Sequence, residues 1–303
     1  MVLVTGGAGF IGSRVVRNLV ERRGVPLASI VVPRSHDLDL RKPENCRRAV
    51  EGCNVVIHMA AVTGGINFSR AHPASQYHDS TLIDLNIIEA ARQHGVEKLV
   101  AIGNLFAYAP SAPVPIHEIS LFDGVPNEAH RGVGMFKRNL ALMAELFHRE
   151  YGLRMVVVYS ANAYGPGDST DPAHSHVIPG TIMKCLRDRK LLVWGDGTPT
   201  RDFLYVDDVA EGLLLAAERL EAPAFANIGS GSEISVRRLV ELIVRHTGFS
   251  GPVEYDATKA GGDARKCAST QRARSSMGFE ASVPMDEGLR RTVEWYRAKL
   301  ATA

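Results

Sequence analysis

The chain has 303 residues, of which 45% are apolar, and its formal net charge is +2. This length can bury a large core in one big domain or two tightly joined ones, and the near-balanced, evenly spread charge argues against nucleic acid or an anionic membrane as the main partner. No apolar run is long enough to span a bilayer, and Met1 directly begins the first predicted strand, so we expect no signal peptide and a cytoplasmic location.

In the first half of the chain, short apolar runs alternate with amphipathic helices. This alternation is typical of a parallel sheet covered by helices on both faces. Strands are predicted at 1–4, 29–32, 55–59, 98–102 and 155–160, and helices follow the stripe from Ile11 to Val20 and span 81–93 and 135–151.

The second half changes character near Asn162, where turn residues become frequent. Loops are predicted from Gly165 to Pro172 and from Gly195 to Pro199, and 225–228 is expected to return to the main sheet as its last strand. Helices are predicted at 177–187, 206–220, 235–247 and 285–300.

A glycine-rich loop joins the first strand to the first helix. Gly6, Gly9 and Gly12 give the spacing Gly-x-x-Gly-x-x-Gly, and Phe10 and Ile11 open the helix. Glycine permits a tight turn and a close approach of the backbone to a pyrophosphate, while the helix N-terminus offers free N–H groups. An ordinary turn is the alternative, but between a strand and a helix this loop predicts a dinucleotide site.

The fold class follows from these elements. We predict an α/β protein built on a Rossmann-type doubly wound parallel sheet, with a smaller, interleaved C-terminal substrate-binding region. The dinucleotide-binding domain is expected at 1–162, with 203–229 returning to it, and the substrate-binding region at 163–202 and 230–303.

The end of the second strand bears on the type of cofactor. An acidic residue there would favour NAD(H) by binding its free ribose hydroxyls, but the first carboxylate after this strand is Asp37. Arg34, and also Arg14, can instead face the 2′-phosphate of NADP(H), although both can equally be solvated surface residues. We expect NADP(H) rather than NAD(H), and we include Asp39 among the cofactor-binding candidates.

The cysteines show neither metal-site nor disulfide-framework spacing, so we expect reduced, mostly buried thiols and no bound metal. They are Cys46, Cys53, Cys185 and Cys267.

Several longer segments carry a family resemblance, and their occurrence in one order makes chance similarity improbable. They are 56–66, which reads Val-Ile-His-Met-Ala-Ala-Val-Thr-Gly-Gly-Ile, together with 86–91, 175–179, 193–199, 201–204, 227–231, 256–259 and 265–266. On these segments the chain resembles the extended short-chain dehydrogenase/reductase (NAD-dependent epimerase/dehydratase) family and, within it, the GDP-L-fucose synthases.

The resemblance implies two ligands, a dinucleotide and a sugar nucleotide. On the cofactor side it implies contacts from Ala60, Ala61 and Lys137. On the sugar-nucleotide side it implies contacts from Asn162, Val177, Lys184, Trp194, Arg201 and Arg265. The two arginines suit a diphosphate, although each alone can be a surface ion pair. Lys184 stands where the fucose synthases have an arginine. The resemblance also implies a homodimer formed through two helices of the first domain.

The catalytic positions depart from the family pattern. Members use a Tyr four residues before Lys137 to exchange a proton, and this chain has Val133 there. Asn104 stands at the position of a Ser that polarises the sugar oxygen, and its amide can still donate a hydrogen bond. Phe106 replaces a Cys that acts with a His in epimerisation, whereas His176 matches that His.

Two functions remain open from the sequence. The first is an atypical NAD(P)-dependent oxidoreductase or epimerase acting on a keto-sugar nucleotide, with Asn104, Lys137 and His176 as catalytic candidates. His130, Tyr108 and Tyr164 are further candidates to replace the missing phenol, although solvated or structural roles suit all three. The second is a degenerate protein that binds NADP(H) or a sugar nucleotide without turnover. Retention of Lys137 and His176 favours the enzyme.

Overall fold

The computed structural model describes residues 1–62, 64–171, 176–259 and 262–302. Thr63, Pro172 and Ser175, which belong to segments singled out above, lie outside the described residues.

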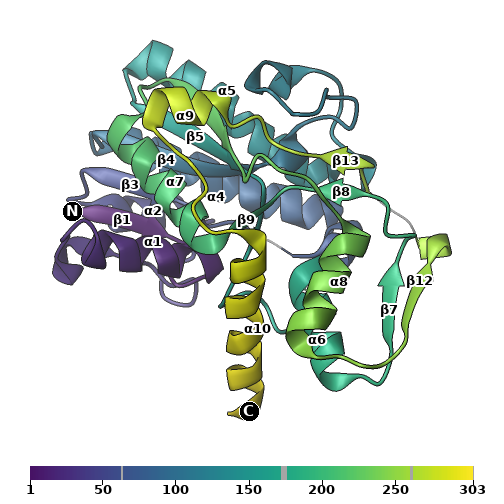
Figure 1. The fold of residues 1–303 in the computed structure, drawn as a ribbon. Helices are drawn as coiled ribbons and strands as arrows, with labels where there is room; N and C mark the ends of the chain where they lie inside the picture. Colours follow the sequence, from purple (N-terminus) through teal and green to yellow (C-terminus); the bar gives the residue numbers. More distant parts are fainter. Residues whose placement is uncertain (63, 172–175, 260–261, 303) are drawn as a thin grey trace.

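A six-stranded parallel sheet forms the centre of the molecule (Figure 1). Its order is β10-β5-β4-β3-β1-β2. The strands are β1 (Val2–Thr5), β2 (Ile30–Val31), β3 (Val55–His58), β4 (Lys98–Asn104), β5 (Met155–Ser160) and β10 (Ala224–Ile228). Every residue of β5 is buried, as expected for a Val-rich strand with helices on both faces. The α/β fold class predicted from the sequence is therefore confirmed.

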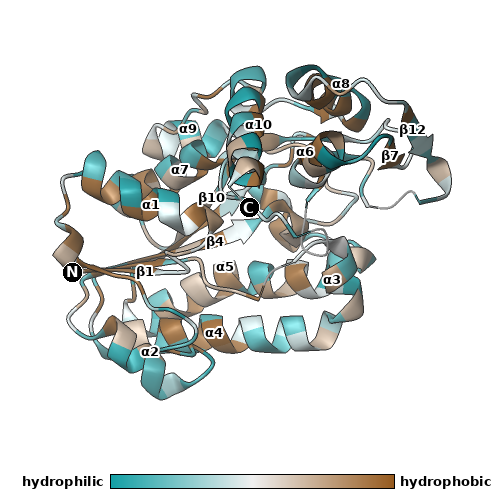
Figure 2. Cartoon of the chain, turned by 90° about the horizontal axis from the view of Figure 1, so that it is seen from below, coloured by the Kyte–Doolittle hydropathy of each residue, from teal (hydrophilic) through white to brown (hydrophobic). Residues whose placement is uncertain are grey.

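Helices cover both faces of this sheet, as Figure 2 shows. On one face α1 (Phe10–Glu21) packs against α7 (Val206–Arg219), and α9 (Gln271–Met277) also contacts α7. On the other face α4 (Pro73–Gln93) contacts both α2 (Pro43–Val50) and α5 (Arg131–Tyr151). The winding direction reverses between β1 and β3, and ligands of such sheets bind beyond the carboxyl ends of the strands at this point.

A second, smaller layer lies beyond the carboxyl ends of the strands. Its helices α6 (Val177–Arg187), α8 (Val236–Thr247) and α10 (Met285–Ala301) share one apolar core with strands from three small sheets. These sheets are β6 (Asn162–Tyr164) with β9 (Phe203–Tyr205), β7 (Leu191–Trp194) with β12 (Val253–Asp256), and β8 (Thr200–Arg201) with β11 (Ile234–Ser235) and β13 (Arg265–Lys266).

In the described ranges, the short remaining elements are α3 (Ile66–Ala71) and the 3-10 helices η1 (Leu27–Ser29), η2 (Leu105–Ala107), η3 (Glu118–Phe122), η4 (Glu128–His130) and η5 (Ala257–Lys259). None of the helices in the described part of the chain is long and apolar enough to cross a membrane.

Two hydrophobic clusters divide the interior. The first fills both faces of the large sheet and also contains Ala268, Met277 and Phe279, which follow the second layer's strands in sequence. The second cluster lies between α6, α8 and α10. The strand predicted at 225–228 does join the large sheet, pairing in parallel with β5. The exact domain boundaries stay a prediction.

Two helices begin earlier than predicted, for a physical reason. The first half of α4 buries polar side chains rather than an apolar stripe: Gln76 donates to the carbonyl of Val62, and Ser80 accepts from the Val62 amide. At the start of α5, Gly134 allows the backbone to approach Phe106, because a Cβ there would lie 2.4 Å from the Phe106 carbonyl oxygen. Neither contact produces a periodic pattern of apolar residues, so the sequence does not show where these two helices begin.

Candidate active site

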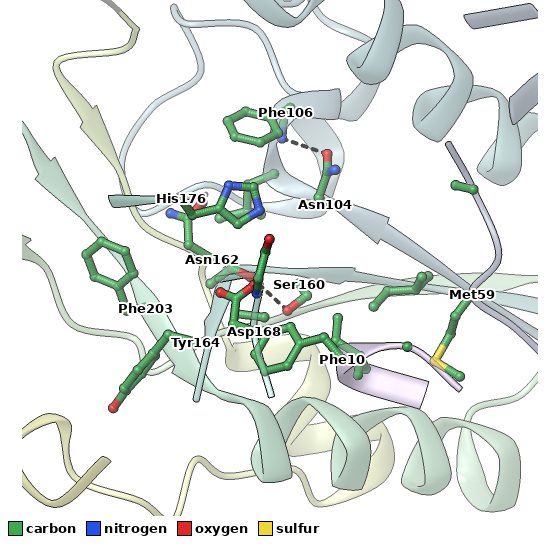
Figure 3. A pocket seen from close by; sticks show the side chains of 18 of the residues that line it. Phe10, Met59, Asn104, Phe106, Ser160, Asn162, Tyr164, Asp168, His176 and Phe203 are labelled. Atoms are coloured by element: carbon green, nitrogen blue, oxygen red, sulfur yellow. Dashed lines mark hydrogen bonds between the residues drawn. The ribbon is translucent and has the colours of Figure 1, made fainter. Parts of the chain in front are cut away.

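A cleft of about 730 Å³ opens where the large sheet meets the second layer. It brings together residues from the carboxyl ends of the parallel strands, from the first turn of α1 and from the start of α6 (Figure 3). The residues predicted from the sequence that line it are Gly6, Gly9, Phe10, Ile11, Gly12, Ala60, Ala61, Asn104, His130, Lys137, Asn162, Tyr164, His176, Val177 and Arg201. The predicted residues outside this lining are Arg14, Arg34, Asp39, Tyr108, Lys184, Trp194 and Arg265.

The glycine loop forms one wall of the cleft, and its geometry requires glycine. Gly6 has a φ of +68°, and a Cβ there would lie 3.1 Å from the Ala60 nitrogen. A Cβ on Gly12 would lie 2.1 Å from the Gly6 carbonyl oxygen. Gly9 instead is exposed and occupies the N-cap position of α1. The N-terminus of α1 is therefore open to the cleft and suited to an anionic group.

Asn104 lies at the end of β4, and its side-chain orientation is fixed. Its Oδ1 accepts a hydrogen bond from the Phe106 backbone nitrogen at 3.1 Å, which caps η2 (Figure 3). Because the oxygen is used in this way, the amide nitrogen is the group left to donate within the cleft. Asn104 is thus placed to donate a hydrogen bond to a ligand oxygen.

Lys137 projects from α5 into the cleft and is only 5% exposed. Burial lowers the pKa of its ammonium group, and the nearby carboxylate of Asp84 partly opposes this effect. Among the described residues, no hydrogen bond from the Lys137 ammonium is present. Val133 lies one helical turn earlier and does not line the cleft. The buried ammonium group of Lys137 is therefore available to a ligand, but the Val133 side chain has no proton to supply.

A buried polar chain, not anticipated from the sequence, links this region to the end of β1, where the glycine loop begins. The Thr5 hydroxyl accepts from the amides of Met59 and Ala60 at 3.1 Å each and lies 2.7 Å from Nδ1 of His58. On the other side, Nε2 of His58 lies 2.9 Å from the Asp84 carboxylate. Since Thr5 has one proton to donate, the chain places the imidazole proton on Nε2, facing Asp84. The only signal in sequence was a His inside an apolar strand.

Phe106 and His130 form a stacked pair at one end of the cleft. Their ring centroids are 4.1 Å apart and the ring planes differ by 21°. Burial lowers the pKa of His130 to about 4, and the positive charge of Lys266 contributes. Lys266 is itself buried and forms an ion pair with Asp263 at 2.6 Å. His130 is thus neutral at pH 7 and poorly suited to donate a proton.

The lowered pKa of His130 predicts that this residue makes the fold less stable in acid. The folded-state value of about 4 lies below the ordinary value of 6.5, so as pH falls the unfolded chain binds the proton first. Between pH 6.5 and pH 4, the free energy of unfolding of the wild type should therefore fall by about 1–3 kcal/mol more than that of His130→Phe. Urea unfolding across this range measures the difference. His94→Phe, at an exposed helix end, is the control, and parallel pH curves for wild type and His130→Phe would contradict the prediction.

Among the other candidate replacements for the phenol, the two tyrosines point away from the cleft. The Tyr108 hydroxyl donates to the side chain of Asn227 at 2.7 Å in the core. Tyr164 lines the cleft with other atoms, but its hydroxyl lies against α10, where a Cβ on Gly288 would be 2.1 Å away (Figure 3). His176 instead is exposed, lies at the N-cap of α6 and lines the cleft.

The residues considered for selecting the cofactor lie in different places. Arg14 donates to the Pro166 carbonyl at 2.7 Å and lies 3.7 Å from Asp207, so it faces α7 rather than the end of β2. Asp39 is paired with Arg41 at 2.8 Å. Arg34 is exposed just after β2, and its guanidinium has no hydrogen bond or ion pair among the described residues.

The residues predicted for the sugar nucleotide are spread along one side of the second layer. Arg201 lines the cleft, and burial lowers the pKa of its guanidinium. Arg265 is paired with Glu233 at the surface. Trp194 is 48% exposed, with the Lys259 ammonium 5.5 Å from its ring, and Lys184 donates to the Leu192 carbonyl at 3.0 Å.

The four cysteines are buried and unpaired, as predicted. Within the described ranges, no group of three or more His, Cys, Asp or Glu side chains is arranged to hold a metal ion.

Comparison with known proteins identifies relatives along the whole chain. The model of the NAD dependent epimerase/dehydratase family matches residues 2–229. A probable GDP-L-fucose synthase of Oryza sativa subsp. japonica is 31% identical over 100% of this chain and 93% of its own. The GDP-L-fucose synthase of Sinorhizobium fredii is 31% identical over 99% of this chain and 96% of its own.

Solved structures agree with these relatives. The UDP-glucose 4-epimerase of Thermotoga maritima, crystallised with UDP-glucose, is 30% identical and has a TM-score of 0.86, covering 99% of each chain. A GDP-L-fucose synthetase of Naegleria fowleri bound to NADP is 25% identical with a TM-score of 0.86, covering 100% of this chain and 95% of that one.

Proposed function

Because this chain belongs to the NAD-dependent epimerase/dehydratase family, we propose that it is an enzyme that reduces or epimerises a keto-sugar nucleotide with NADP(H). The observation that carries this proposal is the arrangement of the cleft. An open helix N-terminus lies in the same cleft as an amide donor, Asn104, and a buried cation, Lys137.

The glycine loop fits a dinucleotide. The exposed Gly9 and the N-terminal turn of α1 leave the backbone accessible to a pyrophosphate, and Ala60 and Ala61 add small side chains to the cleft beside the loop. A bound reduced dinucleotide would supply the hydride for a sugar ketone. The free guanidinium of Arg34 after β2 supports NADP(H), since Asp39, a possible ribose acceptor, is committed to Arg41.

The chain's own residues provide three of the functions that reduction of a ketone needs. Asn104 donates to the carbonyl oxygen, and the positive charge of Lys137 stabilises negative charge developing on it. His176 delivers the proton. We assign Asn162, Val177, Lys184, Trp194, Arg201 and Arg265 to the sugar nucleotide, with the two arginines placed for its diphosphate. Arg265 would then exchange its surface partner Glu233 for the ligand.

The test uses purified protein, NADPH and a panel of GDP-, UDP- and dTDP-linked 4-keto sugars. We expect oxidation of NADPH with a reduced sugar product seen by mass spectrometry, or uptake of solvent deuterium beside the ketone. The replacements at Asn104, Phe106 and Val133 favour a second candidate, a binding protein without turnover. Tight binding of both ligands with neither product nor exchange would support that candidate.

We also propose a homodimer formed through α4 and α5. These neighbouring helices carry exposed apolar side chains, including Leu85 on α4 and Leu142 and Leu146 on α5. Leu142 and Leu146 are four residues apart and therefore share one helix face. A cytoplasmic location stays a prediction.

The double variant Leu142→Glu/Leu146→Glu should be a monomer, because two charges at a buried contact each lack a partner. Light scattering coupled to size exclusion measures the mass. Leu27→Glu, on η1 and 66% exposed, is the control and should stay dimeric. A monomeric wild type at micromolar concentration would contradict the proposed interface.

A further inference from the structure

The loop after β6 has a conformation that holds one carboxylate against the cleft. Gly165 and Gly167 have φ values of +152° and +98°, which side-chain-bearing residues rarely adopt. The turn that they allow places Asp168 in the cleft lining, where it is only 8% exposed. Asp168 is therefore a buried carboxylate in a site otherwise rich in cations.

The C-terminal helix fixes this loop from behind. Tyr296 of α10 is fully buried, and its hydroxyl lies 3.2 Å from the Asp168 carbonyl oxygen and 3.0 Å from that of Ser169. One hydroxyl proton is thus shared between two consecutive carbonyls of the loop. Because Tyr296 is held in the apolar core of the second layer, the backbone at Asp168 has little freedom to move.

The two oxygens of the Asp168 carboxylate have different surroundings. Oδ1 accepts a hydrogen bond from the Ser169 nitrogen at 2.7 Å. Oδ2 is buried and has no hydrogen-bond partner among the described residues. Burial raises the pKa of Asp168, and the positive charge of His176 acts in the opposite direction. A buried acceptor that lacks a donor is costly, so a donor is expected to reach Oδ2 when the site is in use.

His176 is the side chain best placed to be that donor. In Figure 3 its imidazole lies in the cleft between Phe106 and Asp168. The charged and titratable groups around this region include Asp168 from the loop after β6, His130 from η4, Lys137 from α5, Arg201 from β8 and Lys266 from β13. The charges of Asp263 and Arg70 also act on His130. Of these, Asp168 alone is an acceptor without a committed partner, since Asp263 is already paired with Lys266.

We propose that Asp168 is a positioning residue for His176, and that the pair replaces the proton donor that Val133 cannot provide. The inference rests on the proposed function. Oδ2 of Asp168 accepts from one imidazole nitrogen and stabilises the charged ring, and the other nitrogen faces the sugar oxygen. The carbonyl carbon of the sugar receives a hydride, with the electron pair of a C–H bond that breaks in a reduced nicotinamide dinucleotide, and the C=O π pair moves to the oxygen. An N–H bond of the imidazolium breaks and an O–H bond forms on that oxygen. Neutral His176, being exposed, takes a proton from solvent for the next turnover.

The first test needs no substrate. Imidazole nitrogen and proton resonances of His176, identified by their loss in His176→Gln, are recorded at pH 7 in wild type and in Asp168→Asn. We expect the resonances in Asp168→Asn to move toward those of a neutral imidazole. Asp188→Asn, at the exposed far end of α6, is the matched control and should match wild type. Unchanged His176 resonances in a folded Asp168→Asn protein would overturn the pairing.

The second test separates positioning from a general structural role. Asp168→Asn should lower kcat for ketone reduction at least about 10-fold with little change in KM, and Asp168→Glu should recover part of the loss. In the Val133→Tyr background the same substitution should cost less than 3-fold, roughly, because the phenol then supplies the proton. An equal loss in both backgrounds would overturn the proposal.

The NADPH dissociation constant of Asp168→Asn tests whether the carboxylate binds the dinucleotide rather than His176. We expect it to stay within about 3-fold of wild type, that is, within about 0.7 kcal/mol. A large rise with unchanged His176 resonances would show that Asp168 binds the dinucleotide instead, and would overturn the pairing. If no keto sugar is turned over but the resonances shift as expected, the proposed function fails while the Asp168–His176 pair stands.

Discussion

Gly9→Val is expected to abolish binding of a pyridine dinucleotide while leaving the fold intact. Gly9 is exposed, and a Cβ added there meets only the Gly6 carbonyl oxygen, at 3.2 Å. The remainder of a valine side chain then occupies the space in front of the N-terminus of α1, where a pyrophosphate would contact backbone N–H groups. A loss of at least about 100-fold in affinity, equivalent to about 2.7 kcal/mol, is expected in a calorimetric titration with NADPH.

The choice of Gly9 over Gly12 makes this experiment interpretable. At Gly12 a Cβ would lie 2.1 Å from the Gly6 carbonyl oxygen, so any substitution there also disrupts the turn itself. Ala8→Val is the matched control, because Ala8 is exposed, belongs to the same loop and does not line the cleft. Unchanged NADPH affinity in a folded Gly9→Val protein would refute the assignment of the loop.

Val133→Tyr is expected to raise ketone reduction by about 10-fold, which is less than the about 10²–10⁴-fold that a general acid contributes to a site without one, because the proposed Asp168–His176 pair already delivers a proton. Val133 precedes Lys137 by four residues on α5, so both side chains leave the same face of the helix. The buried ammonium of Lys137 would lower the pKa of a phenol beside it, because it favours the anionic form. Single-turnover rates with NADPH and a keto sugar nucleotide measure the gain.

Val133→Phe provides the control for shape. It adds the same ring without the hydroxyl, so the ratio of Val133→Tyr to Val133→Phe isolates the proton-transferring group. Equal rates for the two variants, both folded and both binding NADPH, would mean that the hydroxyl does not reach the sugar oxygen. The stacked Phe106 and His130 rings would then be the first obstacle to examine, since α5 passes close to Phe106.

Sequence periodicity predicted the fold well where apolar residues alone determine burial. β5 and α6 have the bounds expected from their apolar patterns, because both are buried against other apolar elements. The polar helix α2 was missed, since only Cys46, Ala49 and Val50 of its residues are buried. Apolar periodicity predicts packing through apolar side chains. It does not predict a helix that packs through hydrogen bonds, as the first half of α4 does.

Only part of the candidate site was predicted, namely the part that lies in local sequence motifs. Gly12 and Lys137 belong to local motifs whose spacing already implies their place. Asp168 and Lys266 come from distant segments, and only the fold shows that they lie buried in the lining of one cleft, with Asp84 buried near Lys137. Their signal in the sequence was no more than a charged residue in an ordinary context. Burial, which turns such a residue into a functional candidate, cannot be read from spacing.

The position of β10 at the end of the large sheet also has a consequence for biosynthesis. β5 is complete when residue 160 leaves the ribosome, but its free edge stays unpaired until Ala224–Ile228 is made. At about 5–20 residues per second, this delay lasts on the order of 3–13 s. A nascent chain with an open, Val-rich edge invites pairing with other chains. Temporary shielding of that edge by a chaperone would therefore govern the yield of the intact protein, and fragments ending near Asn162 would be prone to aggregate.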